Sequence, residues 1–175
     1  MKLKVQSEKY QVKNYKEEEV KIVINGAGAA GTAVAMLLIK YGFKNLIVCD
    51  SKGAIYLGRQ DLNDEKVVLA EVTNLDRKEG LLGEILVGAD IFIGVSKAGL
   101  LTVEMVKKMA KDPIIFALAN PVPEIMPDLA KSAGAFIIAT GRSDFDNQLN
   151  NSLGFPGLFR GALDNHIKQF NDEIF

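Results

Sequence analysis

Three glycines follow a short apolar run near the start of the chain, at the spacing G-x-G-x-x-G. Gly26, Gly28 and Gly31 come directly after residues 22–24, which read Ile-Val-Ile. At this spacing the first glycine permits a sharp turn, the second lets a pyrophosphate approach the backbone, and the third lets a helix pack close to a sheet. The first N–H groups of such a helix have no partner within it and favour an anion. The pattern therefore predicts a phosphate-binding turn.

An acidic residue stands where this kind of turn requires one. Asp50 ends a second apolar run, residues 46–49, and follows Gly26 by 24 residues (50 − 26). That distance is close to the offset of about 20 residues expected of the acid that binds an adenosine ribose. Strand, turn, helix, strand and acid in this order are much stronger evidence for a dinucleotide site than the glycines alone. We expect the cofactor to contact Gly26, Gly28, Ala29, Ala30, Gly31 and Asp50.

The rest of the chain alternates apolar runs with helical patterns. The runs at 91–95, 114–118 and 136–139 are typical of strands buried on both faces. No strong strand lies between Asp50 and Asp90, where residues 54–58 form at most a short strand or hairpin arm. Helices are expected at residues 29–41, 61–72, 81–86, 102–110, 127–133 and 158–170.

This alternation predicts an α/β fold. We expect a single doubly wound, mostly parallel Rossmann-type sheet with helices on both faces, in the strand order 3-2-1-4-5-6 or a trimmed version of it. Ligands of such sheets bind beyond the carboxyl ends of the strands. Ser96 and Asn120 follow two of the later strands, so we expect both to contact the cofactor. Asn120 and Asn151 are also of the type that caps turns.

The composition excludes several classes of protein. The 175 residues carry a net charge of −1, which does not favour nucleic acid or an anionic membrane as a partner. No apolar run reaches the ~18 residues of a membrane span. The single cysteine, Cys49, excludes an internal disulfide and fits a reducing compartment, so we expect a cytoplasmic protein with Cys49 in its core. His166, the only histidine, is expected to have a surface or packing role.

Five stretches together resemble the NAD(P)-binding domain of malic enzyme, the malate dehydrogenase that also decarboxylates. The runs FALANPVPEIMP and FPGLFRGAL are far more specific than the glycine pattern. Two positions depart from the bacterial pattern, Asp146 where proline is usual and Lys97-Ala98 in place of Ala-Pro. We expect a polar lead-in at 1–19 and the domain at 20–175. The resemblance rests on residues 21–31, 48–59, 90–96, 116–127 and 139–164.

The resemblance implies that malate is oxidised at C2 by NAD(P)+ and then decarboxylated to pyruvate and CO2, with Mg2+ or Mn2+ polarising the carbonyl. It implies that Asn120, Asn150 and Asn151 bind the substrate and the nicotinamide side, because amides donate and accept without adding charge. The family's metal ligands and catalytic tyrosine and lysine precede the first strand, where nothing here matches. Tyr10 and Tyr15 therefore receive no role, and we assign no catalytic residue and no metal ligand.

Three readings stay open at this point. The first is that the chain works with a substrate domain or partner chain, and we also expect a homo-oligomer, as the resemblance implies. The alternatives are a non-catalytic dinucleotide-binding module and the cofactor domain of another dehydrogenase. For the cofactor itself, the Asp50 carboxylate favours NAD, whereas Ser51 and Lys52 could hold the 2′-phosphate of NADP. We expect NAD, with NADP possible.

Overall fold

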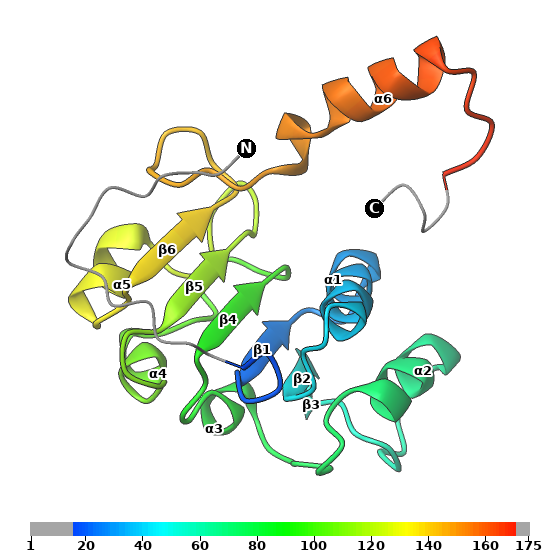
Figure 1. Ribbon diagram of the computed structural model, residues 1–175. Coiled ribbons are helices and arrows are strands. Elements are labelled where there is room, and N and C mark those ends of the chain that lie inside the picture. The colour runs from blue at the N-terminus through cyan, green and yellow to red at the C-terminus, as the bar shows by residue number, and fades with distance from the viewer. Residues whose placement is uncertain (1–15, 171–175) are drawn as a thin grey trace.

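A six-stranded sheet in the order β3-β2-β1-β4-β5-β6 forms the centre of the computed structural model, which describes residues 16–170 (Figure 1). All neighbouring strands run parallel except β2 and β3, which are antiparallel. The predicted Rossmann-type sheet and its strand order are therefore confirmed. Tyr10, Tyr15 and most of the lead-in expected at 1–19 lie outside the described residues. The strands are β1 Ile22–Asn25, β2 Leu46–Asp50, β3 Gly53–Ala54, β4 Ile91–Gly94, β5 Ile114–Ala117 and β6 Ile137–Thr140.

The third position of the sheet is held by a two-residue strand. β3 pairs with the end of β2 through Cys49 with Ala54 and Asp50 with Gly53. Gly53 has φ +109°, and a Cβ atom there would lie 2.3 Å from the carbonyl oxygen of Gly80. The hairpin arm expected at 54–58 therefore starts one residue early and ends at Ala54. Beyond Ala54, the backbone N–H of Ile55 makes one further bond to the carbonyl of Val48, at 2.8 Å.

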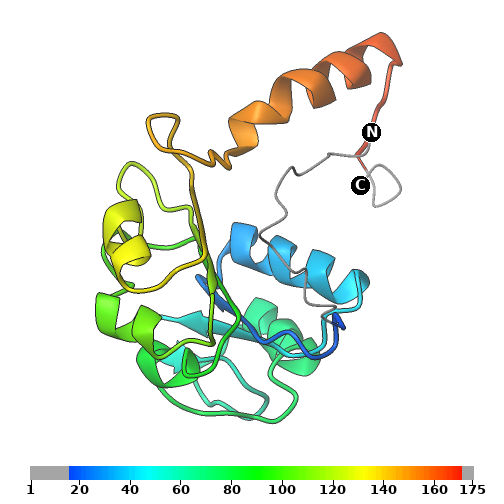
Figure 2. The ribbon, with the colours of Figure 1, turned by 60° about the vertical axis from the view of Figure 1, so that its left-hand side comes forward.

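Helices cover both faces of the sheet, as predicted (Figures 1 and 2). Successive strand residues point to opposite faces, so Ile22 and Ile24 belong to one core and Val23 to the other. The first core includes Ala35 of α1 and Leu69 of α2, and the second includes residues of α3, α4 and α5. These helices are α1 Ala29–Lys40, α2 Asp64–Val72, α3 Leu82–Ile85, α4 Val103–Lys107 and α5 Pro127–Ser132.

The last helix begins and ends earlier than its pattern predicts. A short 3-10 turn, η1 Asn151–Leu153, leads into α6 Phe155–Asp164. Pro156 lies in the first turn of α6, where its missing N–H costs nothing. His166 has φ +53°, a left-handed conformation that stops a helix before residue 170. The expected range 158–170 was therefore wrong at both ends.

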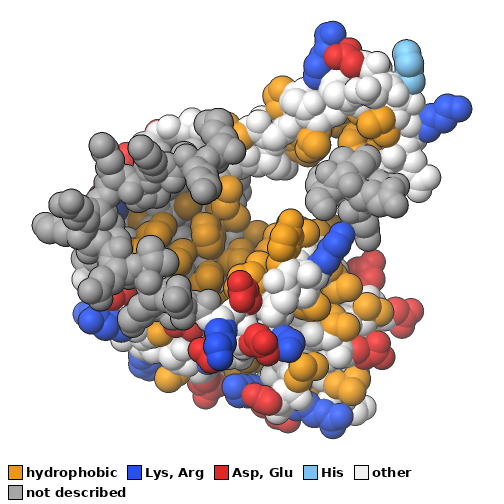
Figure 3. All heavy atoms as spheres, viewed as in Figure 1, with side chains coloured by type: hydrophobic (Ala, Val, Ile, Leu, Met, Phe, Trp, Pro, Cys, Tyr) orange, Lys and Arg blue, Asp and Glu red, His pale blue; other side chains and the backbone are white. Residues whose placement is uncertain are grey.

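Helix α6 stands away from the sheet in both ribbon views (Figures 1 and 2). None of its residues is buried. Figure 3 shows hydrophobic side chains along the side of α6 that faces the sheet and charged ones on the opposite side. The rings of Phe155 and Phe159 stack with their centroids 5.6 Å apart. Those of Phe159 and Phe170 meet edge to face with their centroids 6.4 Å apart. An amphipathic helix of this kind normally covers its apolar stripe.

Two further expectations concern single features. Cys49 is fully buried in β2, and burial raises the pKa of its thiol to about 12, so its predicted place in the core is confirmed. A buried thiol of this kind stays protonated and unreactive. Among residues 16–170, no helix is long and apolar enough to cross a membrane.

Candidate functional site

The glycine turn has the geometry that a pyrophosphate requires. Gly26 has φ +128°, and a Cβ atom there would lie 2.7 Å from the carbonyl oxygen of Val95. A Cβ atom on Gly31 would lie 1.7 Å from the carbonyl oxygen of Gly26, so α1 packs directly on the turn. Gly28, by contrast, has no atom within 4 Å of the place of a Cβ atom. The backbone at Gly28 is therefore open on the side where a phosphate would approach.

The start of α1 adds donors to this opening. Gly28 is the N-cap residue of α1, and no side chain from the described part of the chain caps it. No acidic side chain lies in the first turn, which contains Ala29 and Ala30. The free N–H groups and the helix dipole therefore both favour an anion there. This geometry fits the pyrophosphate of a dinucleotide.

Asp50 lies at the end of β2 and is held by two cations. Its Oδ2 atom accepts from Arg59 Nη2 and from Lys66 Nζ, each at 2.6 Å. Its Oδ1 atom accepts from the backbone N–H of Lys52 at 2.9 Å. Burial alone would raise the pKa of Asp50, but the hydrogen bonds from Arg59 and Lys66 outweigh it and hold the pKa well below its usual range. Asp50 is therefore an ionised acceptor at the place where an adenosine ribose is expected.

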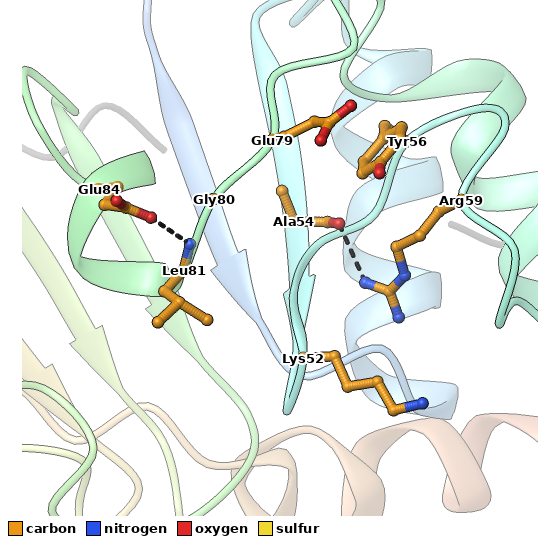
Figure 4. A pocket seen from close by; sticks show the side chains of 8 residues that line it. All are labelled: Lys52, Ala54, Tyr56, Arg59, Glu79, Gly80, Leu81 and Glu84. Carbon is orange, nitrogen blue, oxygen red and sulfur yellow. Dashed lines mark hydrogen bonds between the residues drawn. The ribbon is translucent and has the colours of Figure 1, made fainter.

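Charged side chains extend from Asp50 toward the surface. Asp61 accepts from Arg59 Nε at 2.7 Å and pairs with Lys52 at 2.8 Å. The hydrogen bonds from Lys52 and Arg59 lower the pKa of Asp61 to about 2. A cavity of about 230 Å³ adjoins this group, and Figure 4 shows Arg59 donating to the carbonyl of Ala54 at its edge. Its lining is Lys52, Ala54, Tyr56, Arg59, Glu79, Gly80, Leu81 and Glu84.

Ser96 follows β4 and is exposed at the same edge of the sheet. Its Oγ atom accepts from Nδ2 of Asn25, the buried last residue of β1, at 2.9 Å. Asn25 thereby links the end of the glycine-turn strand to the loop after β4. The hydroxyl of Ser96 keeps its own hydrogen for a ligand at this edge.

Asn120 follows β5 and is also exposed. It precedes Pro121 through a cis peptide bond. Its Nδ2 atom would lie only 2.7 Å from a Cβ atom on Gly141, the residue after β6. The ends of β5 and β6 therefore meet at Asn120, and Gly141 makes the space for its amide.

The two asparagines after β6 differ in their surroundings. Asn150 donates to the carbonyl of Gly141 at 2.7 Å and caps η1 by accepting from the N–H of Ser152 at 2.9 Å. Its amide is therefore used within the protein. Asn151 begins η1 and is exposed, with no side-chain hydrogen bond to another of the described residues. Of this pair, Asn151 has the amide that is free for a ligand.

Sequence reasoning missed three residues of this edge, namely Arg59, Lys66 and Glu124. Arg59 and Lys66 reach Asp50 from segments 9 and 16 residues further along the chain. Arg59 was visible only as the last residue of the family-like stretch 48–59. Glu124 is fully buried beside the loops after β4 and β5, and its place in the stretch 116–127 was the one available signal. Arg142 and Asp144, in the loop after β6, pair with each other.

The residues at this edge fit a dinucleotide and do not fit a metal ion. The open backbone at Gly28 and the carboxylate of Asp50 suit a pyrophosphate and a ribose. Within residues 16–170, no group of three or more His, Cys, Asp or Glu side chains is arranged to hold a metal ion. The described chain therefore has the elements of a cofactor site but not of a metal centre.

Comparison with known proteins agrees with this site. The family model described as "Malic enzyme, NAD binding domain" matches residues 5–175. The chain is 60% identical over 156 residues to the bifunctional malic/malolactic enzyme of Bacillus subtilis, covering 89% of this chain and 38% of that one. It is 49% identical to the NADP-dependent malic enzyme of Escherichia coli, covering 89% of this chain and 21% of that one.

A solved structure gives the same result. The NAD-dependent malic enzyme of Thermotoga maritima superposes with a TM-score of 0.80 at 51% sequence identity, over 85% of this chain and 40% of that one. The chain therefore spans less than half the length of these relatives. It belongs to the malic enzyme family, and its matched residues are those of the family's NAD-binding domain.

Proposed function

We propose that this chain is the cofactor-binding part of a malic enzyme, which oxidises and decarboxylates malate with NAD(P)+ as hydride acceptor. The observation that carries the proposal is the meeting of two kinds of residue at one edge of the sheet. Gly28 and Asp50 lie on the β1–β2 half, and Ser96 and Asn120 lie on the β4–β5 half. A dinucleotide binds across the point where the strand order reverses, with one mononucleotide on each half.

This arrangement sets the direction of the cofactor. The pyrophosphate would lie at the N-terminus of α1 beside Gly28, and the adenosine ribose would lie at Asp50. The nicotinamide would then extend toward Ser96 and Asn120. Asn120 and Asn151 would bind the substrate next to it, since an amide donates to a carboxylate without adding charge. Asn150 would support this region through its bond to Gly141.

The remaining chemistry would come from another part of the enzyme. The family's divalent metal would polarise the substrate carbonyl when bound, but the described residues offer no cluster to hold it. The exposed apolar side of α6 is the surface through which we propose that a substrate domain or partner chain docks. The cofactor edge of the sheet lies on the same side of the molecule as α6 (Figure 1).

Binding and turnover measured together test this function. We expect the 175-residue chain to bind NAD+ in a calorimetric titration, and to give no pyruvate with malate, Mn2+ and NAD(P)+. Adding the substrate domain of a family member should restore pyruvate formation. Robust turnover by the chain alone would contradict the proposal that its catalytic groups come from another part of the enzyme. If the chain bound neither NAD+ nor NADP+, the proposed function as a whole would be wrong.

The same experiment separates the alternatives. A non-catalytic module would bind the cofactor and stay inactive with the added substrate domain. The cofactor domain of another dehydrogenase would reduce NAD+ with a different hydroxy acid. Since the B. subtilis relative is named for a malolactic as well as a malic activity, lactate should be measured beside pyruvate.

A further inference from the structure

Glu124 is a fully buried carboxyl group for which the cofactor site so far has no use. It follows β5 in the stretch Asn120-Pro121-Val122-Pro123-Glu124. Its Oε2 atom accepts from the backbone N–H of Ala119 at 3.0 Å, and its Oε1 atom accepts from the backbone N–H of Ser96 at 3.2 Å. No salt bridge links it to a basic side chain of residues 16–170. Burying a carboxyl group is costly, so its contacts require an explanation.

These contacts fasten two loops to each other. Ser96 belongs to the loop after β4, and Ala119 directly precedes Asn120 in the loop after β5. The main chain adds two more bonds between the same loops. The N–H of Leu101 donates to the carbonyl of Glu124, and the N–H of Gly99 donates to the carbonyl of Pro123, both at 3.1 Å. The side chain of Glu124 is the part of this junction that reaches the residues of the site.

The end of β4 is shaped to admit this side chain. A Cβ atom on Gly94 would lie 2.3 Å from Cδ of Glu124 and 2.4 Å from its Oε1 atom. Any residue larger than glycine at position 94 would therefore displace the carboxyl group. The buried carboxyl group accepts from the backbone of Ser96, whereas Ser96 itself is exposed.

We propose that Glu124 is a positioning residue, which sets Ser96 and Asn120 for the nicotinamide half of the cofactor. This inference rests on the proposed binding of NAD(P)+ by this chain. The groups that would hold the other half are Gly28, the N-cap residue of α1, and Asp50, the last residue of β2. Among the described residues, the Glu124 side chain accepts from Ser96 and Ala119 and makes no hydrogen bond to either of these two. A change at Glu124 therefore acts directly on the loops that carry Ser96 and Asn120, and it reaches the ADP half only indirectly, through the bond from Asn25 to Ser96.

Replacement by glutamine tests the role with almost no change in size. Glutamine keeps one acceptor oxygen, but its NH2 group faces an N–H donor of Ser96 or Ala119. One of the two loops then loses its acceptor. Leaving one buried N–H donor without an acceptor corresponds to about a tenfold change in an equilibrium constant.

The experiment compares NAD+ with ADP-ribose, which lacks the nicotinamide, in calorimetric titrations of the full chain. Glu124→Gln should weaken NAD+ binding about tenfold and leave ADP-ribose binding within about twofold. The control is Glu104→Gln, at an exposed glutamate in the first turn of α4, which should change neither. Equal losses for both ligands, or no loss for NAD+, would overturn the positioning role. If the unsubstituted chain binds neither ligand, the proposed function fails instead.

Hydrogen exchange of backbone amides in the unsubstituted chain is a second test, which does not depend on the folding of a variant. The amide hydrogens of Ser96 and Ala119 should exchange slowly without ligand, because Glu124 accepts both. NAD+ should slow the exchange at Ser96 and Asn120 further, and ADP-ribose should not. Rapid exchange at Ser96 and Ala119, or the same response to both ligands, would overturn the inference.

Discussion

Lys66 Nζ lies 2.6 Å from Asp50 Oδ2, so the acid expected to meet the adenosine ribose already carries an ion pair from α2. The side chain of Asp50 is only 8% exposed, and that of Lys66 is 26% exposed. Arg59, in the loop between β3 and α2, pairs with the same oxygen of Asp50. Asp50 therefore does not present an isolated negative charge, and a cofactor phosphate at the ribose would meet cations beside it. We therefore expect the choice between NAD and NADP to depend on Lys66 as well as on Asp50.

Replacing Lys66 with methionine should weaken NADP+ binding about tenfold and change NAD+ binding little. Opposite charges about 4 Å apart attract by about 4 kcal/mol at an effective dielectric of 20, and partial exposure reduces this. Only NADP+ has the 2′-phosphate that this cation would attract. Calorimetric titration with each cofactor measures the ratio. The control is Lys44→Met, which removes an exposed pair with Glu18 just before β2, whereas Asp50 is the last residue of that strand. A matching loss of NAD+ affinity in Lys66→Met would contradict this prediction.

Replacing Asp50 with alanine should shift cofactor selectivity in the opposite direction, toward NADP+. NAD+ binding should weaken by about 1.5–3 kcal/mol, because the ribose hydroxyls lose a charged acceptor. NADP+ should lose less or gain, since the repulsion disappears and Arg59 and Lys66 become free. Lys52→Ala is the matched comparison, because the Lys52 side chain is 67% exposed and should affect NAD+ binding little. Unchanged NAD+ affinity in Asp50→Ala, with NADP+ affinity lost in Lys52→Ala, would reverse the assignment.

Asp50 should also make the stability of the chain sensitive to acid. Its folded pKa lies below the value of about 3.9 of an unfolded chain, so the unfolded state takes up the proton first. The stabilisation is fully present above about pH 4 and is lost as the pH falls through the folded pKa. Asp50→Asn should lower the urea midpoint at pH 7 and reduce its decline between pH 4 and pH 3. Asp146→Asn, at an exposed loop position, should keep the decline; a parallel decline in Asp50→Asn would contradict the role.

The parallel part of the sheet could be predicted from local patterns, and the segment after Asp50 could not. β4 and β5 are buried runs whose apolar residues alone indicate a strand. β3 exists because Gly53 turns the chain back beside Gly80, a contact between distant residues that no local pattern contains. The start of α6 was missed for a related reason. No residue of α6 is buried. Its apolar residues therefore do not mark where the helix meets a core, and they do not indicate where it begins.

The cofactor side of the site was more predictable than its supporting residues. Gly28 and Asp50 are set by spacing along one strand-turn-helix unit, which sequence shows directly. Lys66 and Glu124 act through side chains that cross between elements. From the sequence alone, Lys66 could equally well be a surface lysine, and Glu124 could equally well be a solvated glutamate. Only the folded chain shows that one reaches Asp50 and that the other is buried and accepts from the backbone of Ser96.

Gly28 and Gly157 provide a matched pair of glycine-to-alanine changes. At both positions a Cβ atom would meet no atom of the protein within 4 Å, so the fold should tolerate either change. Gly28→Ala should weaken NAD+ binding at least about tenfold, because the methyl group occupies the path of the pyrophosphate. Gly157→Ala, in α6, should leave NAD+ binding unchanged and favour the helix. Thermal unfolding and calorimetry separate the two effects, and normal NAD+ binding by Gly28→Ala would place the pyrophosphate elsewhere.

The apolar side of α6 should make the chain associate with itself when no substrate domain is present. Phe159 is 55% exposed and Leu163 is 72% exposed, and an uncovered group of such side chains favours association. Sedimentation velocity at several concentrations should show a rising weight-average mass for the unsubstituted chain and a monomer for Phe159→Glu. Arg160→Gln, on the same helix with its side chain 78% exposed and paired to Asp164, should associate like the unsubstituted chain. Since no residue of α6 is buried, Phe159→Glu should unfold at the same temperature as the unsubstituted chain. A monomer at every concentration without any substitution would show that this surface does not drive association.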